Sequence, residues 1–204
     1  MALQSPRLFF DSVRKGILGP DLSPDEVSGC NAILTAMEGA PIAHAAYALA
    51  TAYHETASTM QPIKEYGGPS YFTRMYDVTG NRPKLARAFG NLSPGDGAKY
   101  FGRGYVQLTW RCNYHKAGAK CGVDLVANPD KALDPGIAAK VMRQGMDEGW
   151  FTGKSLKSYM PGSGRATRQQ FTDARRIING TDKAAKIGAH ALDFQTALES
   201  GGWA

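Results

Sequence analysis

One helix constrains the fold of this chain more than any other feature. After Pro41 the apolar residues follow a helical spacing, and the positions between them are small and apolar too. A helix that is apolar on every side must be surrounded by protein. The main stripe comprises Ile42, Ala45, Ala46, Leu49, Ala50 and Tyr53, and the other faces carry Ala43, Ala48 and Ala52. The rest of the chain is therefore predicted to pack around residues 42–55.

Further helices are predicted on both sides of this one. Their starts are marked by side chains that cap a helix N-terminus, often followed by proline or by an acid or amide three residues on. In the first helix Leu8, Phe9 and Val13 are expected to face inward. The predicted N-terminal residues of these helices are Ser5, Ser23, Trp110, Asp134, Thr167 and Thr181.

The middle of the chain has a different composition. Residues 66–96 are rich in Gly, Pro, Asn and Asp, with short aromatic pieces, which predicts loops and a small irregular sheet, with one or two helical turns at residues 85–89. Residues 105–109 alternate between apolar and polar side chains, as a strand does. Gln107 and Thr109 would then share one face, suited to lining a cleft. The predicted class is α+β, predominantly helical, as a single domain over residues 1–204 with two lobes flanking a cleft and a small helical part at residues 1–40.

Charge limits the expected partners. The net charge is +6, and residues 154–186 hold eight Lys and Arg against only Asp173 and Asp182. Nucleic acid is not expected, because no stacking aromatics are interleaved with these basic residues and no nucleic-acid motif is present. An anionic polysaccharide or bacterial envelope fits the charge, and a merely solvated basic face is the plain alternative.

The termini and cysteines suggest where such a protein would fold. No run of 18 apolar residues exists, and the N-terminus lacks the pattern of a secretory signal, so a cytosolic start without stable membrane insertion is expected. Three cysteines with no metal-ligand spacing predict neither a disulfide framework nor a metal site. A monomer is expected.

Several catalytic chemistries lack their residues. His54-Glu55 is not followed by the second histidine of a zinc protease, because position 58 is Ser. No Gly-x-Ser-x-Gly elbow and no phosphate-binding glycine loop is present. The isolated histidines at 44, 115 and 190 are interpreted as structural. Neither a metal nor an organic cofactor is predicted.

Two carboxylates remain, which is the minimum equipment for hydrolysing a glycosidic bond. Glu55 ends the apolar helix, where the negative end of the helix dipole and partial burial favour the protonated form that a general acid needs. The plain alternative is a glutamate paired with a nearby Lys or Arg. Glu65 follows Pro62 and is the candidate base, with Asp77 and Asp96 as competitors. A separation of roughly 6.5–9.5 Å between acid and base would imply inversion at the anomeric carbon.

Four motifs in this chain resemble those of glycoside hydrolase family 19, the family of chitinases and phage endolysins. They occur in the family's order and span about residues 45–190: His54-Glu55-Thr56, the long run Tyr100–Tyr114, Asn128-Pro129 and Arg176–Gly180. The resemblance implies a lysozyme-like helical fold and an inverting mechanism without metal or organic cofactor.

The resemblance also assigns roles to particular residues. Glu55 matches the general acid, and Thr109 matches the hydroxyl that helps hold the attacking water. The base lies further from the acid in plant chitinases than Glu65 lies from Glu55. Where the family often has Arg-Ile-Gly, this chain has Lys186-Ile-Gly188, which keeps the charge but loses the bidentate fork. The predicted sugar-binding residues are Gln107, Asn113, Asn179, Lys186, Tyr105 and Arg103.

Within that family the chain looks more like an endolysin than a plant chitinase. The expected substrate is peptidoglycan, cut between N-acetylmuramic acid and N-acetylglucosamine, by an enzyme made in a host cytoplasm and acting on the wall after release. A chitinase is the first alternative. A non-catalytic wall-binding protein is the alternative from another class.

Overall fold

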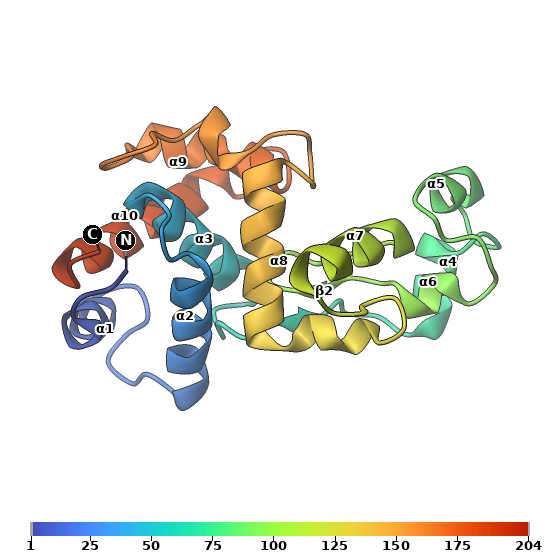
Figure 1. The fold of residues 1–204 in the computed structure, drawn as a ribbon, viewed down its shortest axis with the longest axis horizontal. Coiled ribbons are helices and arrows are strands. Elements are labelled where there is room, and N and C mark those ends of the chain that lie inside the picture. The colour runs from blue at the N-terminus through green and yellow to red at the C-terminus, as the bar shows by residue number, and fades with distance from the viewer. Residues whose placement is uncertain (1, 204) are drawn as a thin grey trace. The chain divides into compact units, whose positions relative to one another are not determined.

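The computed structural model describes residues 2–203 and divides the chain into two compact units. Unit 1 comprises the chain up to Gln61 together with the chain from Met142 onward, and unit 2 comprises Pro62–Val141. Helix α8 (Pro135–Glu148) leads from unit 2 back into unit 1 (Figure 1). The predicted class, predominantly helical α+β with a small antiparallel sheet, is confirmed.

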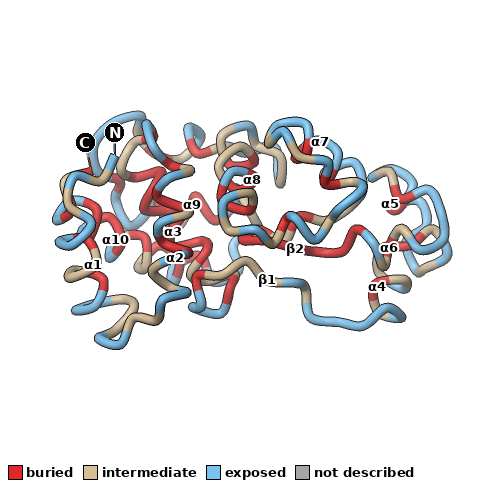
Figure 2. The backbone as a smooth tube through the Cα atoms, turned by 60° about the horizontal axis from the view of Figure 1, so that its bottom comes forward, coloured by how far each residue is buried: buried red, intermediate tan, exposed pale blue. Residues whose placement is uncertain are grey.

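Unit 1 is built around the apolar helix. In α3 (Ile42–Glu55), every residue from Ala43 to Ala52 is buried, which is visible as a continuous buried stretch in Figure 2. Helices α2 (Pro24–Ala36) and α10 (Ala184–Ser200) pack against α3, and α1 (Pro6–Lys15) and α9 (Arg168–Ala174) pack against α10. The prediction that α3 is surrounded by protein is confirmed. Short 3₁₀ turns, η2 (Leu156–Ser158) and η3 (Arg175–Ile177), complete the unit.

Two predicted capping boxes are present in unit 1. At the start of α2, the Ser23 hydroxyl accepts from the Glu26 N–H at 3.2 Å, and the Glu26 carboxylate accepts from the Ser23 N–H at 2.8 Å. Thr167 and Gln170 make the same reciprocal pair at the start of α9. Each box satisfies two N–H groups that the first turn of a helix leaves without partners.

Two predictions in unit 1 were wrong. Leu8 is 51% exposed, because the buried face of α1 is the i, i+4 pair Phe9 and Val13 and Leu8 lies to one side of it. The last helix begins at Ala184, with Lys183 at a φ of 55° before it. The left-handed Lys183 separates Thr181 from the helix, so Thr181 does not cap it.

Unit 2 contains the sheet. Strand β1 (Ile63–Lys64) pairs antiparallel with β2 (Arg103–Gly104), with Ile63 opposite Gly104 and Lys64 opposite Arg103. The other elements are short: α4 (Pro69–Tyr76), α5 (Pro83–Ala88), α6 (Asp96–Lys99), α7 (Arg111–Cys121) and η1 (Pro129–Leu133). Helices α4 and α6 pack together, and η1 contacts β2.

The predicted structure of residues 66–109 was partly wrong. Pro69 lies in the first turn of a helix, so the start of the Gly- and Pro-rich stretch forms α4 rather than a strand. The helical turns predicted at residues 85–89 are present as α5, which begins at Pro83. Residues 105–107 form a turn in which Gln107 has a φ of 53°, and Leu108 exchanges backbone hydrogen bonds with Arg103. The alternating polarity therefore belongs to a tight turn and not to an extended strand.

The cysteines within residues 2–203 are free thiols. Cys30 is buried in α2, and burial, followed by the charge of Glu26, raises the pKa of its thiol to about 12. The thiolate, which is the reactive form, is therefore scarce at neutral pH.

No helix in the described part of the chain has the length and hydrophobicity needed to cross a bilayer.

Candidate active site

Glu55 in unit 1 is paired with a buried arginine. It is the last residue of α3, and its side chain is 20% exposed. Arg175 opens η3 and is only 2% exposed; its Nη1 donates to Glu55 Oε1 at 2.6 Å. The Arg175 Nε donates to the backbone oxygen of Asp182 at 3.0 Å. The guanidinium is thus fixed from two sides and holds one carboxylate oxygen of Glu55.

Sequence reasoning placed Glu55 at the helix end, where the structure has it, but did not identify Arg175 as its partner. The two residues are 120 positions apart. No sequence signal marks this pair, because the need of Arg175 for a counter-charge follows from its burial, which only the structure shows. Within residues 2–203 the other carboxylate oxygen, Oε2, has no protein partner. It is the Glu55 oxygen that a ligand could reach.

Other polar groups of unit 1 lie near this pair. Burial lowers the pKa of His54, and the charges of Arg175 and Lys186 lower it further, against the opposing effects of Glu55 and Asp182. His54 is therefore expected to be neutral at pH 7. Lys186 is exposed on α10. Asn179 is exposed and its N–H donates to the Arg175 carbonyl at 3.0 Å. Sugar binding by Asn179 and Lys186 stays a prediction.

Glu65 in unit 2 directly follows β1 and is held by three donors. The Tyr76 hydroxyl donates to Oε1 at 2.7 Å and the Tyr71 hydroxyl at 3.3 Å, while the Gly102 N–H donates to Oε2 at 3.1 Å. These donors hold both carboxyl oxygens of Glu65 in place. Burial, and then the hydrogen bond to Glu65, raises the pKa of Tyr76, so its hydroxyl stays protonated and donates.

The two competing aspartates, Asp77 and Asp96, hydrogen-bond to nearby loop groups. Asp77 is 1% exposed, and it accepts from the N–H and hydroxyl of Thr79 and from the N–H groups of Gly95 and Gly97. Burial acts to raise the pKa of Asp77, but these hydrogen bonds outweigh it and the pKa is lowered. Asp96 accepts from two backbone N–H groups of its own loop. Both aspartates brace loops, which favours Glu65 as the base. Within residues 2–203 no three His, Cys, Asp or Glu side chains gather as metal ligands.

The residues of the long motif form a chain of hydrogen bonds in unit 2. The Gln107 side-chain NH₂ donates to the carbonyls of Ile63 and Gly104, both at 3.2 Å. The Thr109 hydroxyl donates to the Gln107 carbonyl at 2.8 Å, and Asn113 Nδ2 donates to the Thr109 carbonyl at 2.8 Å. Thr109 still has oxygen lone pairs that can accept from a water. Its predicted water-holding role, and the predicted sugar contacts of Gln107 and Asn113, stay predictions.

Two other predicted sugar-binding residues lie in the interior. Tyr105 is 0% exposed. Arg103 is 4% exposed, pairs through Nε with Asp130 Oδ1 at 2.7 Å, and donates through Nη1 to the carbonyls of Lys99 and Phe101 and to the Tyr114 hydroxyl. The structure therefore gives no support for direct sugar contacts by either residue. Arg103 instead fixes the backbone between α6 and β2.

Comparisons with known proteins place these residues among chitinases. A family model described as class I chitinase of glycoside hydrolase family 19 matches residues 37–157. Endochitinase 1 of Theobroma cacao is 56% identical over 45 residues, which is 22% of this chain and 14% of that protein. Inactive chitinase-like protein 1 of Hevea brasiliensis is 53% identical over 34 residues, covering 17% of this chain and 11% of its own.

A solved structure supports the fold. Chitinase C from Streptomyces griseus HUT6037 superposes with a TM-score of 0.59 at 20% sequence identity, over 97% of this chain and 77% of that one. At this identity the likeness shows the fold, which is the lysozyme-like fold expected from the sequence. The matched segments span only 11–14% of the two plant relatives, so their activities are not carried over with the match.

Proposed function

Because this chain belongs to glycoside hydrolase family 19, the class I chitinase family, we propose that it hydrolyses β-1,4 bonds in polymers of N-acetylglucosamine. In this proposal Glu55 protonates the leaving oxygen, Glu65 activates a water, and Thr109 helps to hold that water. The reaction would proceed with inversion, as the family resemblance implies. The observation that carries it is the family match over residues 37–157, which contains both Glu55 and Glu65.

The surroundings of the two carboxylates support separate roles. When Glu55 has given its proton to the leaving oxygen, the carboxylate that results faces the Arg175 guanidinium at 2.6 Å, which stabilises its charge. Glu65 accepts hydrogen bonds from Tyr71, Tyr76 and the Gly102 N–H, which hold its oxygens in place. A carboxylate fixed in this way is suited to taking a proton from water.

Peptidoglycan is the second candidate substrate. The observation in its favour is the basic stretch 154–186 and the net charge of +6, which suit an anionic wall better than neutral chitin. The names of the relatives favour chitin instead. If peptidoglycan is the substrate, we propose that the protein is a phage-type endolysin. It would then be a monomer that is made in a host cytoplasm and reaches the wall after release.

Product analysis separates these candidates. The full chain would be incubated with a chitin hexasaccharide and with purified bacterial sacculi, and the products identified by mass spectrometry, with Glu55→Gln as the control. Shorter N-acetylglucosamine oligomers support the main proposal, and muropeptides with new reducing ends support the second. Binding to sacculi without any new reducing end would reject both, in favour of a non-catalytic binding protein.

Gly102→Ala is expected to lower kcat by roughly tenfold, because it displaces the proposed base. A Cβ atom at this position would lie 2.7 Å from Gln107 Oε1, which is shorter than Cβ contacts in real proteins, and 3.0 Å from Glu65 Oε2, which would have to move by a few tenths of an ångström. A displacement of a reacting group by about 1 Å costs roughly a hundredfold in rate, so this smaller shift costs less. Steady-state kinetics on a chitin oligosaccharide measures the effect. Gly68→Ala is the matched control in unit 2, because its Cβ would meet nothing within 4 Å; equal rates for the two variants would contradict the prediction.

Tyr66→Ala is expected to raise KM roughly tenfold with little change in kcat. Tyr66 directly follows Glu65 and is 83% exposed, an unusual exposure for a large aromatic side chain. An exposed ring next to the proposed base offers a sugar an apolar face, and stacking of this kind is worth about 1 kcal/mol. Tyr66→Phe should keep the wild-type KM, and Leu92→Ala, which removes another exposed apolar side chain of unit 2, is the control. If KM were unchanged in Tyr66→Ala, Tyr66 would not contribute to substrate binding.

A further inference from the structure

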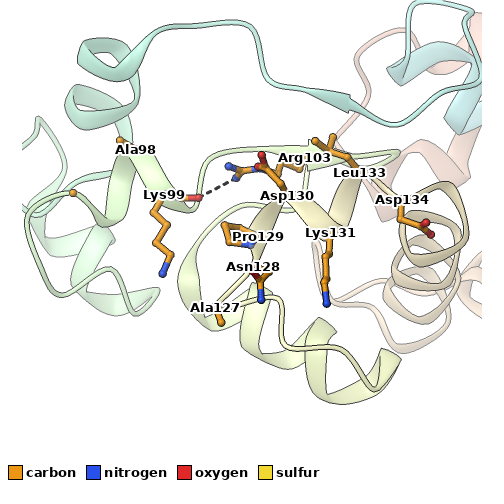
Figure 3. A pocket seen from close by; sticks show the side chains of 11 residues that line it. Ala98, Lys99, Arg103, Ala127, Asn128, Pro129, Asp130, Lys131, Leu133 and Asp134 are labelled. Atoms are coloured by element: carbon orange, nitrogen blue, oxygen red, sulfur yellow. Dashed lines mark hydrogen bonds and ion pairs between the residues drawn. The ribbon is translucent and has the colours of Figure 1, made fainter.

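Unit 2 contains a pocket that the proposed reaction does not use. It has a volume of about 860 Å³ and lies between α6 and the segment from Ala127 to Asp134 that includes η1 (Figure 3). Its lining includes neither Glu65 nor Gln107 or Thr109. Pockets of this size hold ligands as large as a sugar or a disaccharide.

The walls of this pocket are fixed by buried contacts. Arg103 lies behind it, with its guanidinium 3.8 Å from the Phe101 ring centre and its Nε on Asp130. The Tyr100 hydroxyl donates to the Val126 carbonyl at 3.2 Å, which joins the end of α6 to the start of the opposite wall. At Gly104 the backbone of β2 approaches the Ala132 carbonyl so closely that a Cβ would lie 3.1 Å from it. The pocket is therefore preformed.

Its acidic groups are already engaged. Asp130 pairs through Oδ2 with Lys64 at 2.9 Å and through Oδ1 with Arg103 at 2.7 Å. The pKa of Asp130 is lowered chiefly by the Lys64 hydrogen bond, so this aspartate stays ionised and paired. Asp134 Oδ1 accepts from the Ile137 N–H at the start of α8. The charge of Asp130 is thus balanced by Lys64 and Arg103, and within residues 2–203 Asp134 makes no ion pair with a lysine of the pocket.

Unlike Arg103, the two lysines of the pocket have no carboxylate partner within residues 2–203. Lys99 Nζ lies 5.2 Å from the centre of the Tyr100 ring, and among residues 2–203 no carboxylate pairs with it. Within the same described range the side chains of Asn128 and Lys131 make neither hydrogen bond nor ion pair. Figure 3 shows the side chains of Lys99, Asn128 and Lys131 extending to the same side of the chain. The pocket thus presents two ammonium groups and one amide that are free to bind.

We propose that this pocket binds an anionic saccharide, a sugar that carries a carboxylate or a phosphate. Lys99, on the α6 wall, or Lys131, on the η1 wall, would bind the anionic group through a charge-assisted hydrogen bond, and the Asn128 amide would bind a hydroxyl or acetamido group. Small apolar side chains, Ala98, Ala127, Pro129 and Leu133, line the remaining wall and suit the C–H face of a sugar ring. A neutral sugar leaves both ammonium groups without a counter-charge and binds more weakly.

Binding can be measured without hydrolysis, which keeps this proposal separate from the proposed function. The full chain carrying Glu55→Gln would be titrated with N-acetylmuramic acid, N-acetylglucosamine 6-phosphate and N-acetylglucosamine, followed by calorimetry and by the NMR shifts of the backbone amides. At least one acidic sugar is expected to bind in the millimolar range and to shift the amides of Asn128 and Lys131, while the neutral sugar does not. The acid that binds identifies carboxylate or phosphate as the recognised group.

A charge-matched pair of variants gives the decisive comparison. Lys99→Gln with Lys131→Gln should weaken binding of the acidic sugar roughly tenfold or more, since the charge-assisted hydrogen bond to the anionic group is lost. Lys15→Gln with Lys84→Gln changes the net charge equally at exposed sites outside the pocket and should leave binding within about twofold of wild type. Equal weakening in both double variants, equal affinity for the neutral sugar, or no binding of either acid would overturn the proposal.

Discussion

Glu55→Gln is expected to lower kcat at least about a hundredfold, with hydrolysis falling toward the background rate. A general acid supplies roughly 10²–10⁴ of the rate, and glutamine has no proton to give to the leaving oxygen. KM should change little, because glutamine has the size and shape of glutamate and keeps its contacts with a bound sugar. Steady-state kinetics of the wild type and the variant on a chitin oligosaccharide tests the expectation.

Loss of activity in Glu55→Gln should not come from unfolding. The glutamine Oε1 can still accept the hydrogen bond that Arg175 Nη1 makes at 2.6 Å, although the attraction between opposite charges is lost. Replacing a charged acceptor by a neutral one should cost about 1–3 kcal/mol of the free energy of unfolding. Thermal unfolding of both proteins measures this cost.

A carboxylate elsewhere in unit 1 provides the control. Glu38→Gln makes the same chemical change at an exposed position, so it should leave both kcat and stability unchanged. If Glu55→Gln kept the wild-type kcat, Glu55 would not be the general acid. In that case the ion pair with Arg175 would be its whole role, which is the plain alternative considered for the sequence.

The parts of the fold that could be predicted from the sequence are those set by neighbouring residues. The burial of α3 follows from its composition, since a helix with no polar face has no side to present to water. The Ser23 and Thr167 capping boxes join residues three apart, so their pattern is visible in the sequence itself. These rules place helices, but they do not place one helix against another.

The prediction for residues 105–109 failed for a different reason. Alternating polarity has the same appearance in a strand and in a turn whose Val106 and Leu108 are both buried. What distinguishes them is the left-handed backbone of Gln107, which a non-glycine residue adopts only when surrounding contacts compensate for it. Here the Gln107 side chain makes two hydrogen bonds to backbone carbonyls, and one of these belongs to β1.

The contacts of Glu55 and Glu65 could not be predicted from neighbouring residues in the sequence either. The tyrosines that hold Glu65 come from α4, which was predicted as loops and strands, so their common direction could not be inferred. Tyr71 and Tyr76 are five residues apart, a spacing that does not put two side chains on one face of a helix, yet both hydroxyls reach Glu65 Oε1. Arg175 lies in a basic run that suggested a solvated face, yet it is the largest fully buried side chain. Charge counts along a sequence do not reveal which single charge is buried.

Arg175→Ala is expected to destabilise the protein by about 3–5 kcal/mol, the range found when one partner of a buried ion pair is removed. The substitution leaves the Glu55 carboxylate without its counter-charge and the Asp182 carbonyl without the donor that lies at 3.0 Å. It also opens a void where a side chain only 2% exposed was packed. For a chain of this length the midpoint of thermal unfolding should fall by roughly 6–20 °C.

Arg176, next to Arg175 in the chain, is the control, because it carries the same charge on an exposed side chain. Arg176 pairs with Asp173 at 2.5 Å, but the two side chains are 46% and 37% exposed, so solvent screens the pair and Arg176→Ala should destabilise the protein far less than Arg175→Ala. Arg175→Lys keeps the charge but cannot reach both Glu55 and Asp182 with the geometry of a guanidinium, so it should lie between the two alanine variants. Combining Arg175→Ala with Glu55→Gln should destabilise less than the sum of the single changes, because the unpaired carboxylate is gone. Additive effects in that double variant, or equal losses for Arg175→Ala and Arg176→Ala, would mean that the contact at 2.6 Å contributes little to the stability of unit 1.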